Sequence, residues 1–277
     1  MINQRLPEFN VVAAGRTSLL PIPRYALTLK EMELRLGGTM SIALIDEIRL
    51  KIGTSTRWSI KGTHLAAINA YKEIAASPLH VPILFSERDG KNIVEEEAGG
   101  WDLSKLPDQA FLEIDINAAA VNPTMYAMGW FTPPQGSDKS RGQVIQKYVK
   151  AVFQANVTGA ARNQLAFDPK GALVKRAFFF YTGADFSPTT DGNLFKLEVK
   201  KNGGVVWEPT CLDARFSQVR YKHVPQSKLL VVDFIVDNNL SGALRSSDAR
   251  ALEWNAFVTA VDVITAVFDV LDRPNNL

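Results

Sequence analysis

With 277 residues, of which 46% are hydrophobic and 22% are charged, the chain is long enough for two globular domains and too apolar to be disordered. The formal net charge is only +2, and basic residues are scattered among acidic ones, which argues against a specific nucleic-acid partner. The single cysteine, Cys211, excludes an intramolecular disulfide framework, and we expect it to be a small buried side chain.

The first half of the chain has the pattern of short strands separated by turn residues. Ile48, Leu50 and Ile52 alternate with charged residues, as in a strand with one buried and one exposed face. A helix is predicted to open at Gly62 and to end at Pro78. Strands are predicted over residues 18–22, 25–36, 42–52, 80–85, 111–116 and 125–131, and a polar loop over residues 87–100.

Residues 132–142 are the strongest linker signal in the sequence, because they combine the pair Pro133 and Pro134 with glycine, serine and aspartate. We therefore place the domain boundary there. The sequence predicts an N-terminal domain of residues 1–134 and a C-terminal domain of residues 135–277.

The second half is predicted to contain strands over residues 145–157, 173–181, 194–199, 205–207 and 228–236, and a helix near residues 212–221. Its last segment is ambiguous. Phe257, Val261 and Ile264 could line one face of a helix, yet many neighbouring residues are β-branched and favour strands. The correspondence with the first half decides for strands.

One pattern occurs twice along the chain. A strand, a turn, a strand and a helix are predicted around Trp58, and the same order is predicted around Trp207, 149 residues later. A second pair of similar segments aligns Leu112 with Leu252, 140 residues later, so the copies differ by nine residues of loop. The sequence therefore predicts an all-β fold of two β-sandwiches in tandem, each with a helix inserted in a loop.

No secretory or membrane-spanning segment is predicted. Arg5, Pro7 and Glu8 stand where a secretory signal would have its apolar core. The most apolar run, residues 256–271, contains two aspartates and is shorter than the ~20 apolar residues of a spanning helix. We expect a protein that is made and assembled in a reducing cytoplasm.

The sequence contains no pattern of catalytic or cofactor-binding residues. His64, His80 and His223 are too widely spaced for a metal-ligand pair, and His64 and His223 are predicted to be surface or capping residues of the two helices. No glycine-rich loop has the context of a phosphate site, and neither Cys211 nor any serine lies in a nucleophile motif. We therefore expect no enzyme.

Two charged features have simple interpretations. The acidic residues 95–97 and the loop 185–191 could offer oxygen ligands to calcium, but solvated acidic loops are the favoured interpretation. Lys175 and Arg176, part of the nearest approach to a basic cluster, are interpreted as lying on a solvated strand face.

A resemblance to a known family is carried by residues 10–15, Ser18, residues 20–22, Tyr25 and the block 48–72. These residues resemble the N-terminal jelly roll of the corticovirus major capsid protein, the coat of a lipid-containing icosahedral phage. The resemblance covers the first third of the chain by residue identity and the remainder by pattern.

The resemblance implies a double jelly roll, two eight-stranded β-sandwiches with short helices inserted in loops. In that family, three subunits form a pseudo-hexagonal homotrimer over an internal membrane. The implied partners are further copies of the chain, neighbouring trimers, penton or vertex proteins, membrane-associated virion proteins and the lipid membrane itself. Calcium has a role in some coats, but no ligand set for it can be assigned in this sequence.

A coat protein acts through its interfaces, so aromatic side chains in or beside loops are candidates for contacts between subunits. Trp101, Trp130 and Phe131 are the candidates in this sequence, and packing in the core is an equal alternative for each. By analogy with the family, residues 1–5 are expected to be a flexible segment near the membrane or a neighbouring protein.

Two other functions compete with that of a coat protein. A tandem jelly-roll glycan amidase or hydrolase also joins two sandwiches in one chain, but that class is normally exported and no secretory signal is predicted. A lectin-like carbohydrate-binding module would use exposed aromatic residues, and its glycan binding would be lost on changing Trp101 or Trp130.

Overall fold

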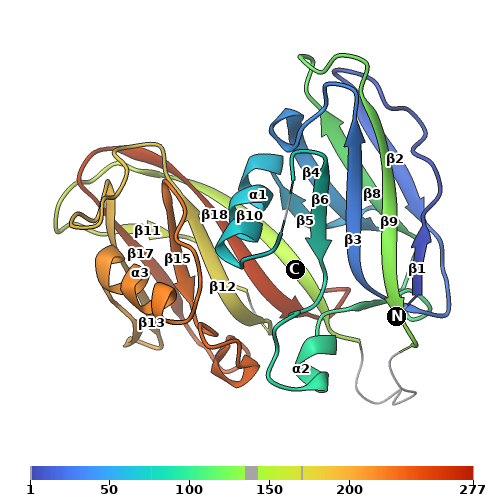
Figure 1. Cartoon of the computed structure of the whole chain (residues 1–277). Coiled ribbons are helices and arrows are strands. Elements are labelled where there is room, and N and C mark those ends of the chain that lie inside the picture. The colour runs from blue at the N-terminus through green and yellow to red at the C-terminus, as the bar shows by residue number, and fades with distance from the viewer. Residues whose placement is uncertain (1, 76, 135–142, 170, 277) are drawn as a thin grey trace. The chain divides into compact units, whose positions relative to one another are not determined.

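The computed structural model describes residues 2–75, 77–134, 143–169 and 171–276, and it consists mainly of β-strands (Figure 1). Its contacts divide into two compact units. Unit 1 comprises Met1–Ala70, Ile74–Val149 and Leu271–Leu277, and unit 2 comprises Tyr71–Glu73 and Lys150–Val270. Residues 135–142, the centre of the predicted linker, lie outside the described residues.

The strands of unit 1 fall into two antiparallel sets. The first has the strand order β1 (Ile2–Arg5), β9 (Thr124–Thr132), β3 (Thr28–Gly37) and β6 (His80–Leu84), and the short β7 (Trp101–Asp102) also pairs with β3. The second has the order β5 (Ser55–Ile60), β4 (Ile45–Ile52), β8 (Ala110–Ile116) and β2 (Thr17–Ile22). The helical segments are η1 (Ile42–Leu44), α1 (Gly62–Tyr71) and α2 (Ile93–Glu97).

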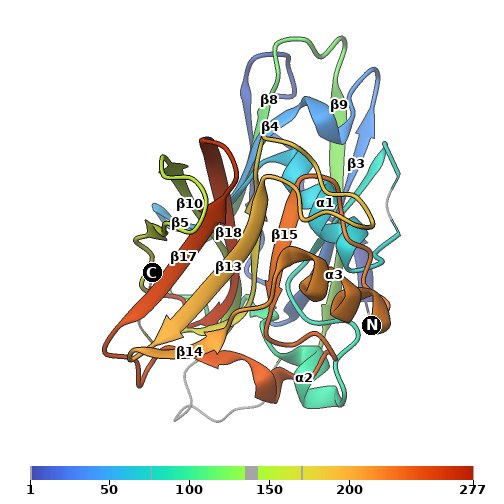
Figure 2. The same ribbon diagram turned by 90° about the vertical axis from the view of Figure 1, so that its left-hand side faces the viewer.

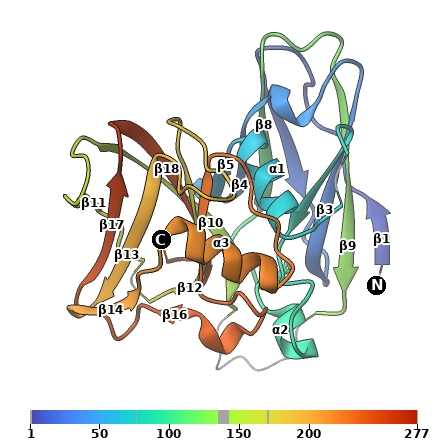
Figure 3. The ribbon, with the colours of Figure 1, turned by 60° about the vertical axis from the view of Figure 1, so that its left-hand side comes forward.

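Unit 2 has the same plan. One set of strands has the order β10 (Ile145–Ala155), β18 (Asp262–Asp272), β12 (Leu173–Phe180) and β15 (Leu229–Asp233), and the short β16 (Leu244–Arg245) also pairs with β12. Of β10 and β18, the parts from Lys150 and up to Val270 belong to unit 2. The other has the order β14 (Gly204–Trp207), β13 (Leu194–Lys201), β17 (Leu252–Val258) and β11 (Asn163–Leu165), in which β14, β13 and β17 lie side by side (Figure 2). The helical segments are α3 (Cys211–Arg220), which packs on β13 and β15 (Figure 3), and η2 (Leu240–Gly242).

The alternation of apolar and polar residues along the strands explains why these sheets form. In unit 1, Leu20, Leu112 and Leu50 lie opposite one another on β2, β8 and β4, and all three are fully buried. Burial of each leucine side chain contributes about 2 kcal/mol. In unit 2 the ring of Trp254 on β17 lies 4.9 Å from that of Phe268 on β18. An apolar core therefore lies inside each unit.

The predicted duplication is confirmed strand by strand. Each strand from β1 to β9 has a counterpart from β10 to β18 in the same place in its sheet, and α1 corresponds to α3. Leu50 lies opposite Trp58, and Val199 lies opposite Trp207, so the spacing of 149 residues is correct.

The second spacing is wrong by two residues. Leu112 is the partner of Leu50, and Trp254 is the partner of Val199, so Leu112 corresponds to Trp254 rather than to Leu252. A shift of two residues keeps every side chain on its face of the sheet, so the hydrophobic pattern alone did not reveal it.

Other expectations are also confirmed or corrected. The ambiguous last segment forms strands β17 and β18, as predicted. The predicted polar loop of residues 87–100 contains α2, whose N-cap is Asn92. Residues 2–5 are not a flexible segment, because they form β1 and pair with β9. Among the described residues, no helix is long and apolar enough to span a membrane.

Candidate functional site

Two of the three aromatic interface candidates lie in the core of unit 1. Trp101 and Phe131 are each 0% exposed. The indole Nε1 of Trp101 donates a 3.2 Å hydrogen bond to the carbonyl oxygen of Gln146, and the ring of Phe131 packs edge-on against Tyr25 at 5.7 Å. Both therefore pack in the core, the alternative that the sequence left open.

Trp130 differs from its neighbours because it lies on the outer face of β9. Ala127 and Phe131 on this strand are fully buried, whereas Met128 and Trp130 are partly exposed. In the sheet, Trp130 is the partner of Glu31 on β3. A large aromatic side chain next to a carboxylate on a partly exposed sheet face can contact another protein.

The outer face of β3 is acidic at Glu31 and Glu33. Glu33 is already paired, since its Oε1 lies 2.8 Å from Nε of Arg35 and 2.5 Å from Nδ1 of His80. Burial raises the pKa of Glu31, and the neighbouring Glu33 carboxylate raises it further, partly offset by Arg88. A further cation close to Glu31 would therefore stabilise the ionised form of its carboxyl group.

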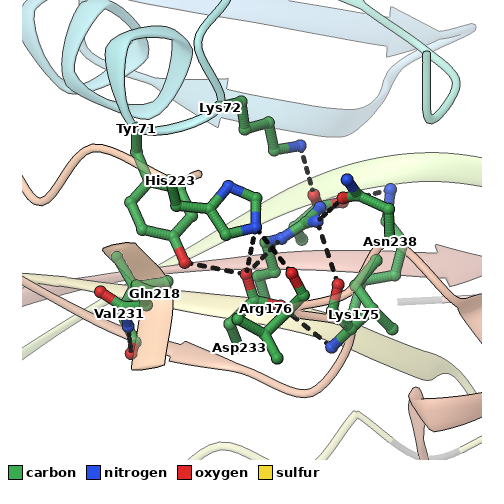
Figure 4. Close-up of polar contacts among 12 residues, drawn as sticks. Tyr71, Lys72, Lys175, Arg176, Gln218, His223, Val231, Asp233 and Asn238 are labelled. Carbon is green, nitrogen blue, oxygen red and sulfur yellow. Dashed lines mark hydrogen bonds and ion pairs between the residues drawn. The ribbon is translucent and has the colours of Figure 1, made fainter. Parts of the chain in front are cut away.

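Unit 2 contains a buried polar cluster centred on Asp233 (Figure 4). Its Oδ2 accepts hydrogen bonds of 2.9 Å from the hydroxyl of Tyr71 and 2.8 Å from Nε of Arg176. Its Oδ1 accepts a 2.9 Å bond from the backbone nitrogen of Ile235. A buried charge is tolerated when it is paired and hydrogen-bonded in this way.

A second buried carboxylate, Asp269, lies between two lysines of unit 2. Nζ of Lys72 lies 3.0 Å from Oδ2, and Nζ of Lys175 lies 3.0 Å from Oδ1. Lys175 and Arg176 are 0% and 1% exposed, so their interpretation as a solvated strand face is wrong. Their neighbours in β12 are apolar, and this was the one available signal that the two cations are buried.

His223 is buried, so its prediction as a surface or capping residue is also wrong. Its ring stacks on Tyr71 with centroids 4.7 Å apart, and its Nε2 lies 3.0 Å from the carbonyl oxygen of Val236. Burial lowers the pKa of His223, although the Asp233 carboxylate opposes this. Burial raises the pKa of Tyr71 well above its ordinary value. The cluster thus holds a neutral imidazole and a protonated phenol, a structural arrangement rather than an activated nucleophile.

The remaining candidate chemical groups have structural partners. Cys211 is buried, as predicted, and burial raises the pKa of its thiol. Asp191 accepts a 2.5 Å hydrogen bond from the backbone nitrogen of Leu212, and Glu95 accepts one of 2.9 Å from that of Lys91. In the described parts of the chain, no three His, Cys, Asp or Glu residues are grouped so as to hold a metal ion. We assign no calcium ligands.

Comparison with known folds gives full-length matches. The chain is similar to the major capsid protein P2 from Bacteriophage PM2, with a TM-score of 0.85, 14% identity, and coverage of 100% of this chain and 99% of that chain. It is also similar to the major capsid protein of STIV, with a TM-score of 0.73, 16% identity and coverage of 98% and 96%. The Faustovirus major capsid protein gives a TM-score of 0.60, 10% identity and coverage of 98% and 90%. These likenesses establish the fold as a double jelly roll.

Comparison of sequences gives the family. No curated protein sequence matches the chain. The family model of the viral coat protein P2 N-terminal domain matches residues 3–132, and that of the viral coat protein P2 C-terminal domain matches residues 145–274. With nearly all of its length matched by these two models, the chain belongs to the viral coat protein P2 family and is a major capsid protein, a structural component of the virion and not an enzyme.

Proposed function

We propose that three copies of this protein associate into a pseudo-hexagonal trimer, and that these trimers tile an icosahedral shell. The observation that carries the proposal is the duplication, in which the two units share strand order and register. Three copies supply six similar units, which suit six positions around a ring. Closed rings of this kind arise from head-to-tail contacts whose rotation closes.

The domain boundary at residues 134 and 135 is part of this proposal, with one jelly roll in residues 1–134 and the other in residues 135–277. The family matches support it, since one ends at residue 132 and the other begins at residue 145. Each domain would occupy one of the six positions. Trp130 is retained as an interface candidate because it is partly exposed on β9.

The wider setting follows from the resemblance to coats of lipid-containing phages. We propose a shell that lies over an internal lipid membrane and contacts penton or vertex proteins and membrane-associated virion proteins. We further propose synthesis and assembly in the host cytoplasm. The similarity to a bacteriophage major capsid protein supports a phage origin.

The trimer is tested by size-exclusion chromatography with light scattering over a range of protein concentrations. We expect a species of three times the chain mass of 30.6 kDa. A strictly monomeric protein at every concentration would contradict the proposal. Electron microscopy of the purified protein at high concentration, or of its source particle, tests the hexagonal outline and the shell.

A further inference from the structure

The C-terminal ends of α1 and α3, each with the two residues that follow, are equivalent in the two copies of the fold. Trp58 and Trp207 occupy the same sheet position before the two helices. Glu73 and Lys222, also 149 residues apart, both adopt a left-handed backbone, with φ of 53° and 67°. Positive φ is uncommon for such residues, so its repetition at the same spacing supports the equivalence. We name residues 71–73 the α1 tail and residues 220–222 the α3 tail.

The α1 tail belongs to unit 2, and its first two residues, Tyr71 and Lys72, are buried. Tyr71 donates its hydroxyl hydrogen to Asp233 on β15, and its ring packs edge-on against Phe178 on β12 at 5.8 Å. Lys72 pairs with Asp269 on β18, as described above. Figure 4 shows Tyr71 and Lys72 directed at this polar cluster. The tail thus covers the outer face of β12 and β15.

The outer face of β12 in unit 2 corresponds to the outer face of β3 in unit 1. Leu29 pairs with Trp101 on β7 as Val174 pairs with Leu244 on β16. Two residues further along each strand, Glu31 therefore corresponds to Arg176. Arg176 is 1% exposed beneath the α1 tail, whereas Glu31 is partly exposed.

The α3 tail is exposed at all three residues, whereas Tyr71 and Lys72 of the α1 tail are buried. Arg220, Tyr221 and Lys222 are all exposed, and the preceding helix exposes Phe216 at 75% and Val219 at 58%. The equivalent positions of α1 carry small side chains, Ala67 and Ala70. Large apolar side chains on the solvent side of a helix, next to two cations, indicate a surface that another protein covers.

We propose that α3 and its tail cover the outer face of β3 and β9 in unit 1 of a second copy of this chain. Arg220 then lies beside Glu31 and Trp130, and the cationic tail meets the acidic face of β3. This contact reproduces between copies the arrangement that the α1 tail makes in unit 2. It rests on the proposed trimer, since such a head-to-tail contact repeated three times closes a ring.

The charges of the two surfaces are complementary. The α3 tail contributes Arg220 and Lys222, while the acceptor face contributes Glu31, whose environment favours an added cation, and Trp130 offers its ring to a guanidinium. In unit 2 the equivalent of Glu31 is Arg176, which already has Asp233 and Asn238 as partners. Unit 1 therefore carries a carboxylate where unit 2 carries a guanidinium, and a carboxylate suits the cationic α3 tail.

Charge reversal of the α3 tail tests the proposal on the full-length chain. Arg220→Glu with Lys222→Glu keeps an allowed backbone, because Glu73 already occupies the equivalent left-handed position. We expect the concentration at which trimers dissociate to rise about tenfold or more, since like charges then face each other. Glu31→Lys alone should have a similar effect. The triple variant, in which the charges are exchanged, should recover much of the wild-type assembly.

The matched control is Arg245→Glu with Arg250→Glu, which reverses two exposed arginines elsewhere in unit 2 and should leave assembly unchanged. Circular dichroism and thermal unfolding establish that each variant is folded, and Glu31→Gln replaces Glu31→Lys if the latter is not. The inference is overturned if the α3-tail variant assembles like the wild type, or if the triple variant recovers nothing. If the wild type is itself never trimeric, the proposed function fails as well.

Discussion

The hydroxyl of Tyr71 donates a 2.9 Å hydrogen bond to Oδ2 of Asp233, 162 residues further along the chain. Because the same carboxylate also pairs with Arg176, the bond fixes the position of a buried ion pair. Tyr71 belongs by its contacts to unit 2, although it is the last residue of α1. The polar cluster therefore depends on a side chain from the first half of the sequence.

Tyr71→Phe tests this bond without changing the volume of the core. Removal of one hydroxyl donor to a buried carboxylate should lower the free energy of unfolding by about 1–3 kcal/mol. Chemical denaturation gives the value. Tyr126→Phe, which alters an exposed tyrosine of β9, is the control and should have little effect. Equal effects of the two variants would show that the Tyr71 hydroxyl does not stabilise the fold.

Asp269→Asn should be far more damaging, because it removes the negative charge that pairs with two buried lysines. The loss of one partner from a buried ion pair typically destabilises by about 3–5 kcal/mol. The measurement is again the free energy of unfolding. Asp248→Asn removes the partner of Lys201 in an exposed pair and should leave stability nearly unchanged. If Asp269→Asn were equally mild, the charge of Asp269 would not be what stabilises the two buried lysines.

Stability should depend on pH through His223. Its pKa in the folded protein lies below its unfolded value of about 6.5, so the unfolded chain binds the proton more readily. The stability that His223 contributes is therefore fully present above about pH 6.5. It declines as the pH falls from there towards the pKa of His223 in the folded protein. In the wild type, the denaturation midpoint should be lower at pH ~5.5 than at pH ~7.5.

His223→Gln is the variant that isolates this effect, because glutamine can still donate to the carbonyl of Val236. Its midpoint should change less between the two pH values. The lowered pKa of Asp115, which arises first from its hydrogen bond with Arg49, acts only as the pH falls below about 4 and lies outside this window. An unchanged pH dependence in His223→Gln would assign the effect to another group.

Much of the fold could be predicted because short strands leave a strong alternating pattern. Ile48, Leu50 and Ile52 were placed correctly on a buried face. The short helix α2 is not predicted, although Asn92 followed three residues later by Glu95 is a capping signal. Oδ1 of Asn92 accepts from the backbone nitrogen of Glu95, and Glu95 accepts from that of Lys91, just before the N-cap. The run of three glutamates around it suggested a solvated loop instead.

The polar cluster of unit 2 could not be predicted, because its charges come from distant parts of the chain. Lys175 and Arg176 gain their partners from Asp269 and Asp233. Nothing local to the basic pair shows these carboxylates, so the sequence alone predicts a surface position for the two adjacent cations. A strand pattern that occurs twice can be recognised from its spacing in the sequence. A polar contact that occurs once, between distant residues, cannot.

Trp101 and Trp130, which the sequence presents as equal interface candidates, should behave differently on mutation. Trp101→Ala empties a fully buried site and should cost about 3–5 kcal/mol of unfolding free energy, as is usual for a large aromatic residue in a core. Trp130→Ala removes a partly exposed ring from the face that we assign to a second copy, so it should cost about 1 kcal/mol but weaken the trimer. Denaturation and light scattering on the same samples separate the two effects. If Trp130→Ala forms trimers at wild-type concentrations while remaining folded, Trp130 is not an interface residue.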